Sequence, residues 1–183
     1  MIGRQVILVR HAMPDIRRGV APALWGLSEA SREDCVLLAH ALPDGLSPTI
    51  FASDEPKARE TAEIIGLRRG LQVALDTGFR EVDRPTAWDD DYRIAAASYL
   101  ANGLRDGWEP RDSVVRRFGS SVLAALNATE HGTTVIVNHG LALSLWLAAL
   151  ADIDLVPFWQ ALTLPDAWLF DIDGATSKRL WAG

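Results

Sequence analysis

Short, uninterrupted apolar runs rich in β-branched residues recur along the chain and predict buried strands. The clearest of them are residues 6–9, 49–52 and 133–137. Runs of this kind are typical of strands covered on both faces, as in a parallel sheet between helices. Residues 168–172 and 178–181 predict a late strand pair. Asp173 and Gly174 lie between them, and Asp-Gly is a common hairpin turn.

Segments with helical periodicity lie between these strands. They cover residues 28–41, 56–66, 92–104, 112–129 and 141–151. Strands that alternate with helices predict an α/β fold, a three-layer sandwich with helices on both faces of a mostly parallel sheet. The sequence shows no repeat and no linker, so we expect a single domain over residues 1–183. The least regular stretch, residues 78–110, is expected to form a lid or side wall.

Composition and charge narrow the class of protein. The 183 residues are 49% hydrophobic and 23% charged, with a formal net charge of −6. This balance does not favour binding to DNA, RNA or an anionic membrane. No apolar run approaches the length of a signal segment or a membrane span, so we expect a soluble, cytoplasmic protein. The single cysteine, Cys35, excludes an internal disulfide and is expected to be a buried thiol on a helix.

Three predicted strands are followed by polar side chains. These are Arg10 and His11 after the first strand, Ser53, Asp54, Lys57 and Arg59 after the second, and Asn138, His139 and Gly140 after the third. Ligands of open α/β sheets bind beyond the carboxyl ends of the strands, so the pattern predicts one cationic crevice. No glycine-rich phosphate loop follows the first strand, so side chains would have to hold a phosphate. A lone strand-end histidine is more often structural, but several such elements at one sheet edge favour a functional site.

Four sequence blocks carry a resemblance to a known family. They read LVRHAMP at residues 8–14, SDEPKARETA at 53–62, FREV at 79–82 and VIVNHG at 135–140. In this order the blocks resemble the histidine phosphatase superfamily, with its phosphoglycerate mutase-like fold, in the Arg-His-Ala variant. Each block alone is a weak signal, whereas the four together, spread over residues 6–140, are specific.

The resemblance implies a phosphomonoester hydrolase that works through a phosphohistidine. His11 would be the nucleophile, since a neutral imidazole nitrogen can attack phosphorus. Glu81 would donate a proton to the leaving alkoxide and later accept one from water. The groups that surround the phosphoryl group would be Arg10, Lys57, His139 and Gly140, the last at a helix start that adds positive potential. We expect no metal and no cofactor, and a small-molecule phosphate monoester as the partner.

Lys57 is a departure from the family pattern. Members usually carry arginine four residues before the threonine of the second block, and Thr61 assigns that place to Lys57. The lysine ammonium is a point charge and cannot bind two phosphate oxygens in the bidentate geometry of a planar guanidinium. We interpret Lys57 as the substitute and Arg59 as a solvated or ion-paired helix residue. Arg84, shortly after the acidic block, is an alternative source of compensating charge.

Other residues are weaker candidates for the site. Glu109 and Arg117 fall at the spacing of another family Glu and Arg, and we expect Glu109 to be a helix cap. Arg17 and Arg18 are available to contact the non-reacting part of a substrate, although paired loop arginines are usually just solvated. Trp25, Trp88 and Trp108 lie in segments that can wall a pocket, and core packing explains each equally well.

Three alternative functions remain at the level of sequence. A phosphoglycerate mutase would return the phosphoryl group to a substrate hydroxyl, but residues 12–15 read AMPD and lack the pattern that mutases carry there. A non-catalytic phosphate-binding module is supported by Lys57 alone. Metal ligation by His11 and His139 lacks cysteines or a paired His-x-x-His spacing. Neither the substrate nor the oligomeric state follows from the sequence.

Overall fold

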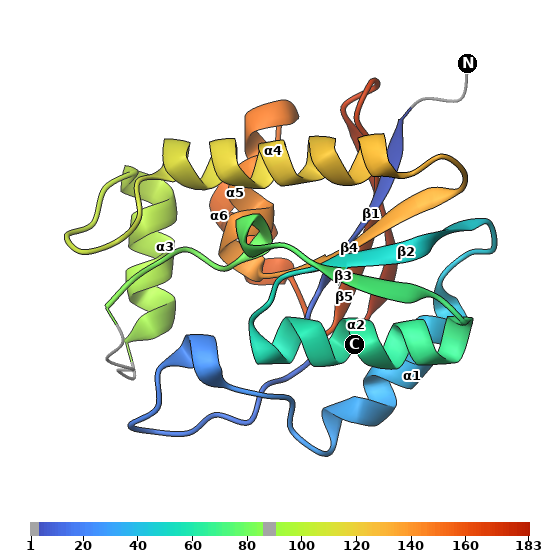
Figure 1. Ribbon diagram of the computed structural model, residues 1–183. Coiled ribbons are helices and arrows are strands. Elements are labelled where there is room, and N and C mark those ends of the chain that lie inside the picture. The colour runs from blue at the N-terminus through green and yellow to red at the C-terminus, as the bar shows by residue number, and fades with distance from the viewer. Residues whose placement is uncertain (1–3, 86–90) are drawn as a thin grey trace.

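Six strands form one sheet in the structure, a computed structural model that describes residues 4–85 and 91–183 (Figure 1). The strands are β1 Gln5–Arg10, β2 Leu46–Ala52, β3 Gln72–Leu75, β4 Thr133–Asn138, β5 Asp166–Asp171 and β6 Thr176–Ala182. Their order across the sheet is β3-β2-β4-β1-β5-β6. The pairs among β1 to β4 are parallel, whereas β5 pairs antiparallel with both β1 and β6. The prediction of a mostly parallel sheet is confirmed.

The central strand β1 shows why the apolar runs form buried strands. Val6 to Val9 are all completely buried. Because side chains alternate along a strand, Val6 and Leu8 pack into one hydrophobic cluster while Ile7 and Val9 pack into the other. The sheet therefore carries a core on each face.

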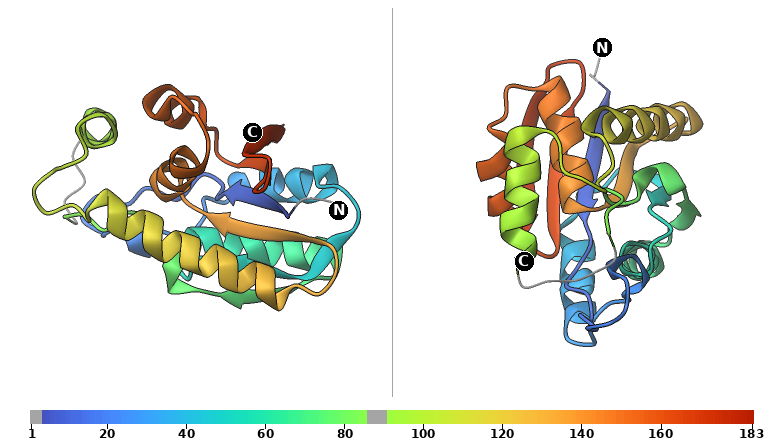
Figure 2. Two further views of the ribbon diagram at one scale, coloured as in Figure 1. Left: turned by 90° about the horizontal axis from the view of Figure 1, so that it is seen from above. Right: turned by 90° about the vertical axis from the view of Figure 1, so that its left-hand side faces the viewer.

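Helices cover both faces of this sheet (Figures 1 and 2). They are α1 Ser31–Ala41, α2 Pro56–Arg69, α3 Tyr92–Asn102, α4 Arg111–Ala128, α5 Gly140–Leu150 and α6 Leu155–Ala161. Buried residues of α1 and α2 complete the cluster around Ile7 and Val9, and those of α3 to α6 complete the cluster around Val6 and Leu8. This is the predicted three-layer arrangement.

The sequence pattern missed two short elements. Strand β3 has only four residues and lies at the sheet edge, where its side chains are half-buried or exposed. Helix α6 has seven residues, of which Trp159 alone is buried. Neither is long enough to establish a periodicity. The predicted hairpin is present, and Asp171 accepts hydrogen bonds from the backbone N–H groups of Asp173 and Gly174 in its turn.

The stretch 78–110 includes the helix predicted at residues 92–104, which the structure places at Tyr92–Asn102. It contains the end of a short 3-10 helix, Thr77–Phe79, and the whole of α3. Trp88, Asp89 and Asp90 lie outside the described residues. Among the helices that the structure describes, none is both long and apolar enough to cross a membrane.

Candidate active site

The carboxyl ends of β1, β2 and β4 meet at one edge of the sheet. The His11 N–H donates to the carbonyl of Asn138 at 3.0 Å, and the Ser53 N–H donates to the carbonyl of Val137, also at 3.0 Å. Three segments far apart in the sequence are thereby joined just beyond the strands. The predicted convergence of strand ends is present, and it places the His11 ring 5.1 Å from the His139 ring, measured between centroids.

His11 is held in one tautomer by its own backbone. Its Nδ1 lies 2.7 Å from the carbonyl oxygen of Ala12, which can only accept, so Nδ1 carries the proton and donates. The Nε2 atom then has the free lone pair. Burial, followed by the nearby His139 and Lys57, lowers the pKa of His11 well below its usual value. His11 is therefore a neutral imidazole with one nitrogen available for attack.

His139 is the deepest of these residues, with no exposed surface. Its Nε2 is hydrogen-bonded to Oγ of Ser53 at 2.9 Å. Its Nδ1 has no hydrogen-bond partner among the described residues. Burial and then the charge of Lys57 lower the pKa of His139 well below the usual value. This imidazole is neutral and offers one unsatisfied nitrogen inside the protein.

Arg10 is anchored from a part of the chain that the motifs do not include. Its Nη1 donates to the carbonyl oxygens of Leu162 at 3.0 Å and Thr163 at 3.4 Å. A Cβ at Gly140 would lie 3.0 Å from Arg10 Nε, which is closer than such contacts normally allow. Gly140 is therefore the residue that lets the guanidinium pack against the start of α5.

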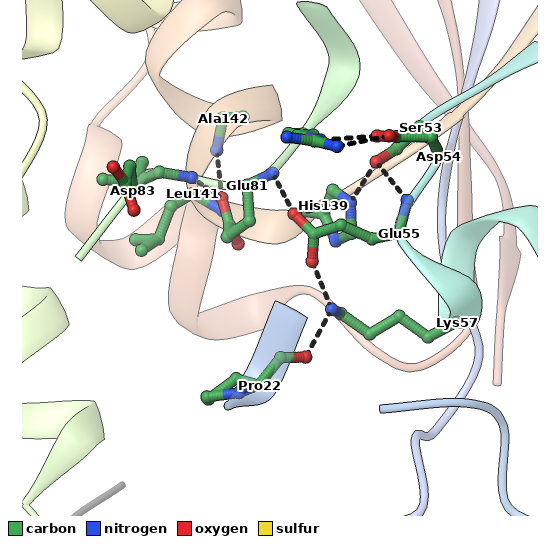
Figure 3. A network of polar contacts seen from close by, with 12 residues as sticks. Pro22, Ser53, Asp54, Glu55, Lys57, Glu81, Asp83, His139, Leu141 and Ala142 are labelled. Carbon is green, nitrogen blue, oxygen red and sulfur yellow. Dashed lines mark hydrogen bonds and ion pairs between the residues drawn. The ribbon is translucent and has the colours of Figure 1, made fainter. Parts of the chain in front are cut away.

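Lys57 is buried at the start of α2 and is already engaged. Its Nζ donates to the carbonyl of Pro22 at 2.9 Å and to Oε2 of Glu55 at 2.5 Å (Figure 3). Glu55 is itself only 7% exposed. No role was predicted for Glu55 from the sequence. The sequence does contain a signal for such a role, because Glu55 stands two positions before Lys57, the inward-facing cation of residues 53–62.

Glu81 lies against the N-terminus of α5. Its Oε1 accepts from the N–H of Ala142 at 2.9 Å and its Oε2 accepts from the N–H of Leu141 at 3.1 Å (Figure 3). The Val82 N–H also donates to Oε1, at 3.0 Å. A carboxylate is favoured at this position by the positive end of the helix. The positive end of α5, which we expected to act on a bound phosphate, therefore also orients the Glu81 side chain.

Arg117 holds the loop that carries Glu81. Its guanidinium forms a two-pronged ion pair with Glu109, at 2.9 and 2.8 Å. The same group donates to the carbonyls of Gly78, Arg80 and Glu81, at 2.7 to 3.0 Å. The expectation that Glu109 caps a helix is wrong, since its carboxylate accepts from the Arg117 side chain and from the Asp83 N–H and not from the backbone N–H groups at the start of α4. Both residues fix this loop, and both also line the cleft.

Two further arginines differ in position. Arg84 lies in the cleft, with its guanidinium carbon 4.6 Å from the centroid of the Tyr92 ring and 5.7 Å from that of Trp108. Arg59 lies on an exposed part of α2, 3.6 Å from Glu63. The interpretation of Arg59 as an ion-paired helix residue agrees with this geometry.

These residues line or underlie a cleft of about 1380 Å³. Arg10, His11, Glu55, Lys57 and Glu81 belong to its lining. Residues 80–85 and 107–110 form part of the wall, as expected of the irregular stretch. The other predicted wall residues, Trp25 and Trp108, also line the cleft, and Trp88 falls outside the described residues. The space is large enough for a small phosphorylated molecule.

Comparison with known proteins identifies the family. The sequence profile described as histidine phosphatase superfamily (branch 1) matches residues 6–173. The chain belongs to the histidine phosphatase superfamily. It is 27% identical over 159 residues to the probable phosphoglycerate mutase GpmB of Erwinia tasmaniensis, covering 80% of this chain and 74% of that protein. The protein of the same name in Escherichia fergusonii is 26% identical over 150 residues, or 73% of this chain and 66% of its own length.

Solved structures of the superfamily have the same fold. YhfR of Bacillus stearothermophilus superposes with a TM-score of 0.77 at 24% identity, covering 96% of this chain and 94% of the other. The mycobacterial glucosyl-3-phosphoglycerate phosphatase Rv2419c superposes with a TM-score of 0.74 at 23% identity, covering 98% and 99%. At this level of identity the likeness shows the phosphoglycerate mutase-like fold and leaves the substrate open.

Two remaining candidates, Arg17 and Cys35, do not line the cleft. Arg17 forms an exposed ion pair with Asp15, at 2.7 Å. Cys35 is buried in α1, and burial raises the pKa of its thiol to about 11, so the expectation of a buried thiol is confirmed. In the described ranges, 4–85 and 91–183, no group of three or more His, Cys, Asp or Glu side chains is arranged to hold a metal ion.

The two buried histidines predict a loss of stability in mild acid. Below pH 6.5 the unfolded chain takes up protons that His11 and His139 do not bind in the folded state. Each histidine should therefore lower the free energy of unfolding by up to about 1.4 kcal/mol for each pH unit below that value. Urea unfolding between pH 7.5 and 5.5 measures the slope. The His11→Asn variant should show a shallower slope, and a flat profile in the wild type would contradict the assignment.

Proposed function

We propose that this histidine phosphatase hydrolyses phosphate monoesters through a phosphohistidine on His11. The observation that carries the proposal is the tautomer of His11, whose Nδ1 donates to the Ala12 carbonyl and leaves the Nε2 lone pair for attack. The residue sits among Arg10, Lys57 and His139 in the cleft, where a transferring phosphoryl group needs positive charge and hydrogen-bond donors. Ala12 after the histidine matches the Arg-His-Ala variant.

The proposed reaction has two displacements. First, Nε2 of His11 forms a bond to phosphorus while the bond from phosphorus to the ester oxygen breaks, and Glu81, in its protonated form, gives that oxygen its proton. Second, Glu81 accepts a proton from a water molecule, whose oxygen attacks phosphorus as the bond to Nε2 breaks. The products are an alcohol and inorganic phosphate, and both His11 and Glu81 return to their initial states.

Binding of the phosphoryl group falls to the cations and the inner imidazole. The orientation of the Arg10 guanidinium is set by its two hydrogen bonds to backbone carbonyls and by its packing against Gly140. Two of the three N–H donors of the Lys57 ammonium are bound to Pro22 and Glu55, so one remains for a phosphoryl oxygen. The buried, unpartnered Nδ1 of His139 would gain a hydrogen bond once it carries a proton that it can donate to a phosphoryl oxygen.

A second candidate function is transfer of the phosphoryl group to a hydroxyl, as in a mutase. The likeness to proteins named probable phosphoglycerate mutase favours it. The chemistry at His11 would be identical, and only the acceptor in the second step would differ. We favour water as the acceptor because AMPD at residues 12–15 departs from the mutase pattern.

One screen tests the proposal. Purified protein is incubated with an aryl phosphate and a panel of sugar, organic-acid and nucleoside monophosphates, with and without acceptor hydroxyl compounds and EDTA. We expect inorganic phosphate to be released from at least one substrate at a rate that EDTA leaves unchanged. Phosphate that reappears on the acceptor would indicate a mutase, and loss of turnover with EDTA would contradict the metal-independent mechanism. Phosphate binding without turnover would support the alternative of a non-catalytic phosphate-binding module.

A further inference from the structure

The cleft contains a buried carboxylate that the proposed reaction does not use. Glu55 stands directly before α2, and its backbone carbonyl accepts from the N–H groups of Ala58 and Arg59, both at 3.0 Å. Its own N–H donates to Oγ of Ser53 at 3.2 Å. The backbone is thus fixed on both sides, and the side chain reaches inward among Lys57, Glu81 and His139 (Figure 3).

Both oxygens of Glu55 contact groups of the proposed machinery. Oε2 accepts from Nζ of Lys57 at 2.5 Å, and Oε1 accepts from the backbone N–H of Glu81 at 2.9 Å. Oε1 also lies 3.7 Å from Nε2 of His139. We propose that Glu55 is a positioning residue that fixes Lys57 and Glu81 and sets the net charge of the phosphoryl pocket. The proposal rests on the function proposed above.

The chemistry of the two contacts requires a carboxylate. Lys57 and the Glu81 N–H are both donors, and only an ionised carboxyl group presents an acceptor to each. Glutamine at this position has nearly the same shape, but its carbonyl oxygen replaces only one of the two carboxylate oxygens, and its NH₂ group would face the other donor. The change Glu55→Gln therefore removes one contact and one charge with little change in volume.

Glu55 also determines what Lys57 contributes. The ion pair is buried, with 7% of each side chain exposed, so the two charges are poorly screened by water. When Lys57 alone is lost, an unpaired carboxylate remains beside the place of the phosphoryl group and repels it. When both side chains are replaced, the pocket binds phosphate more weakly than in the wild type, but no carboxylate remains to repel the phosphate. The pair should therefore behave as a unit and not as two independent residues.

A double-mutant cycle tests this dependence. Wild type, Glu55→Gln, Lys57→Gln and the double variant are compared by calorimetry with inorganic phosphate and by kcat on the substrate found in the screen. Lys57→Gln should weaken phosphate binding about 100-fold, and the double variant only about tenfold, because breaking one side of a buried pair costs more than removing both. Glu55→Gln should bind phosphate several-fold more tightly while kcat falls roughly tenfold, as the loop of Glu81 loses its acceptor.

Controls use the same changes elsewhere in the chain. Glu63→Gln on the exposed side of α2 and Lys178→Gln on β6 should leave binding and kcat at wild-type values. A double variant that binds phosphate no better than Lys57→Gln would overturn the proposal, as would a Glu55→Gln variant with unchanged binding and kcat. If a single variant fails to fold and the double variant folds, the pairing is supported by that result.

The outcomes separate this proposal from the proposed function. Phosphate binding is measured without turnover, so the cycle can succeed in a protein that hydrolyses nothing. Conversely, wild-type hydrolysis together with a Glu55→Gln variant that keeps both its phosphate binding and its kcat would retain the phosphatase and remove Glu55 from its pocket.

Discussion

Replacing His11 with alanine is expected to lower kcat by at least about 10⁴-fold, because loss of a covalent nucleophile removes the whole reaction path. The imidazole has no nearby substitute. His139 has its Nε2 hydrogen-bonded to Ser53 and lies deeper, with no exposed surface. Steady-state hydrolysis measures the loss of activity, and quenching in alkaline detergent with radiolabelled substrate tests for the phosphoenzyme directly, because a phosphohistidine is stable in base. The wild type should accumulate an acid-labile phosphoprotein, and the variant should not.

The matched control is His131→Ala, which removes an exposed histidine far from β1 in the sequence. It should retain wild-type kcat and the phosphoprotein. Because His11 is buried, each variant also needs a melting curve to show that it is folded. A folded His11→Ala protein that kept most of its turnover would refute the phosphohistidine mechanism, however well the sequence blocks match the family.

Replacing Glu81 with glutamine is expected to lower kcat by about 10² to 10⁴-fold on an alkyl phosphate, the usual size of a general acid's contribution. The loss should be much smaller on an aryl phosphate, since a phenolate leaves without protonation. Carboxylate oxygens of Glu81 accept from Leu141 and Ala142, so the group is well oriented in the cleft before any ligand binds. The ratio of the two losses is the measurement.

Glu63→Gln again serves as the control, because it makes the same chemical change on an exposed helix surface. Equal losses on the alkyl and the aryl phosphate would indicate that Glu81 supports the fold of the α5 N-terminus and does not transfer the proton. Such a result would leave the role of His11 intact and would direct attention to Glu55, the buried carboxylate of the cleft.

Local patterns were sufficient for the elements that build the sheet and for the residues at its edge. The β-branched run at Val6 to Val9 can be satisfied only by burial on both faces, and the structure buries all four side chains. Arg10 and His11 follow that run directly, so the direction of the chain assigns them to the carboxyl edge. The sequence likewise assigns Gly140 to this edge, because a helix begins directly after His139.

Long-range contacts decided what these residues can do. Arg10 depends on carbonyls of Leu162 and Thr163, about 150 positions away in the chain, and nothing in either segment signals the other. Glu81 meets α5 only because the loop that carries it is held by Arg117. The sequence by itself determined the sheet, its chemistry-bearing edge and the family blocks, because those depend on neighbours within a few positions. Which groups orient Arg10, Glu81 and His139 depends on atoms that the fold brings within hydrogen-bond distance from remote segments, and only the tertiary structure decided these contacts.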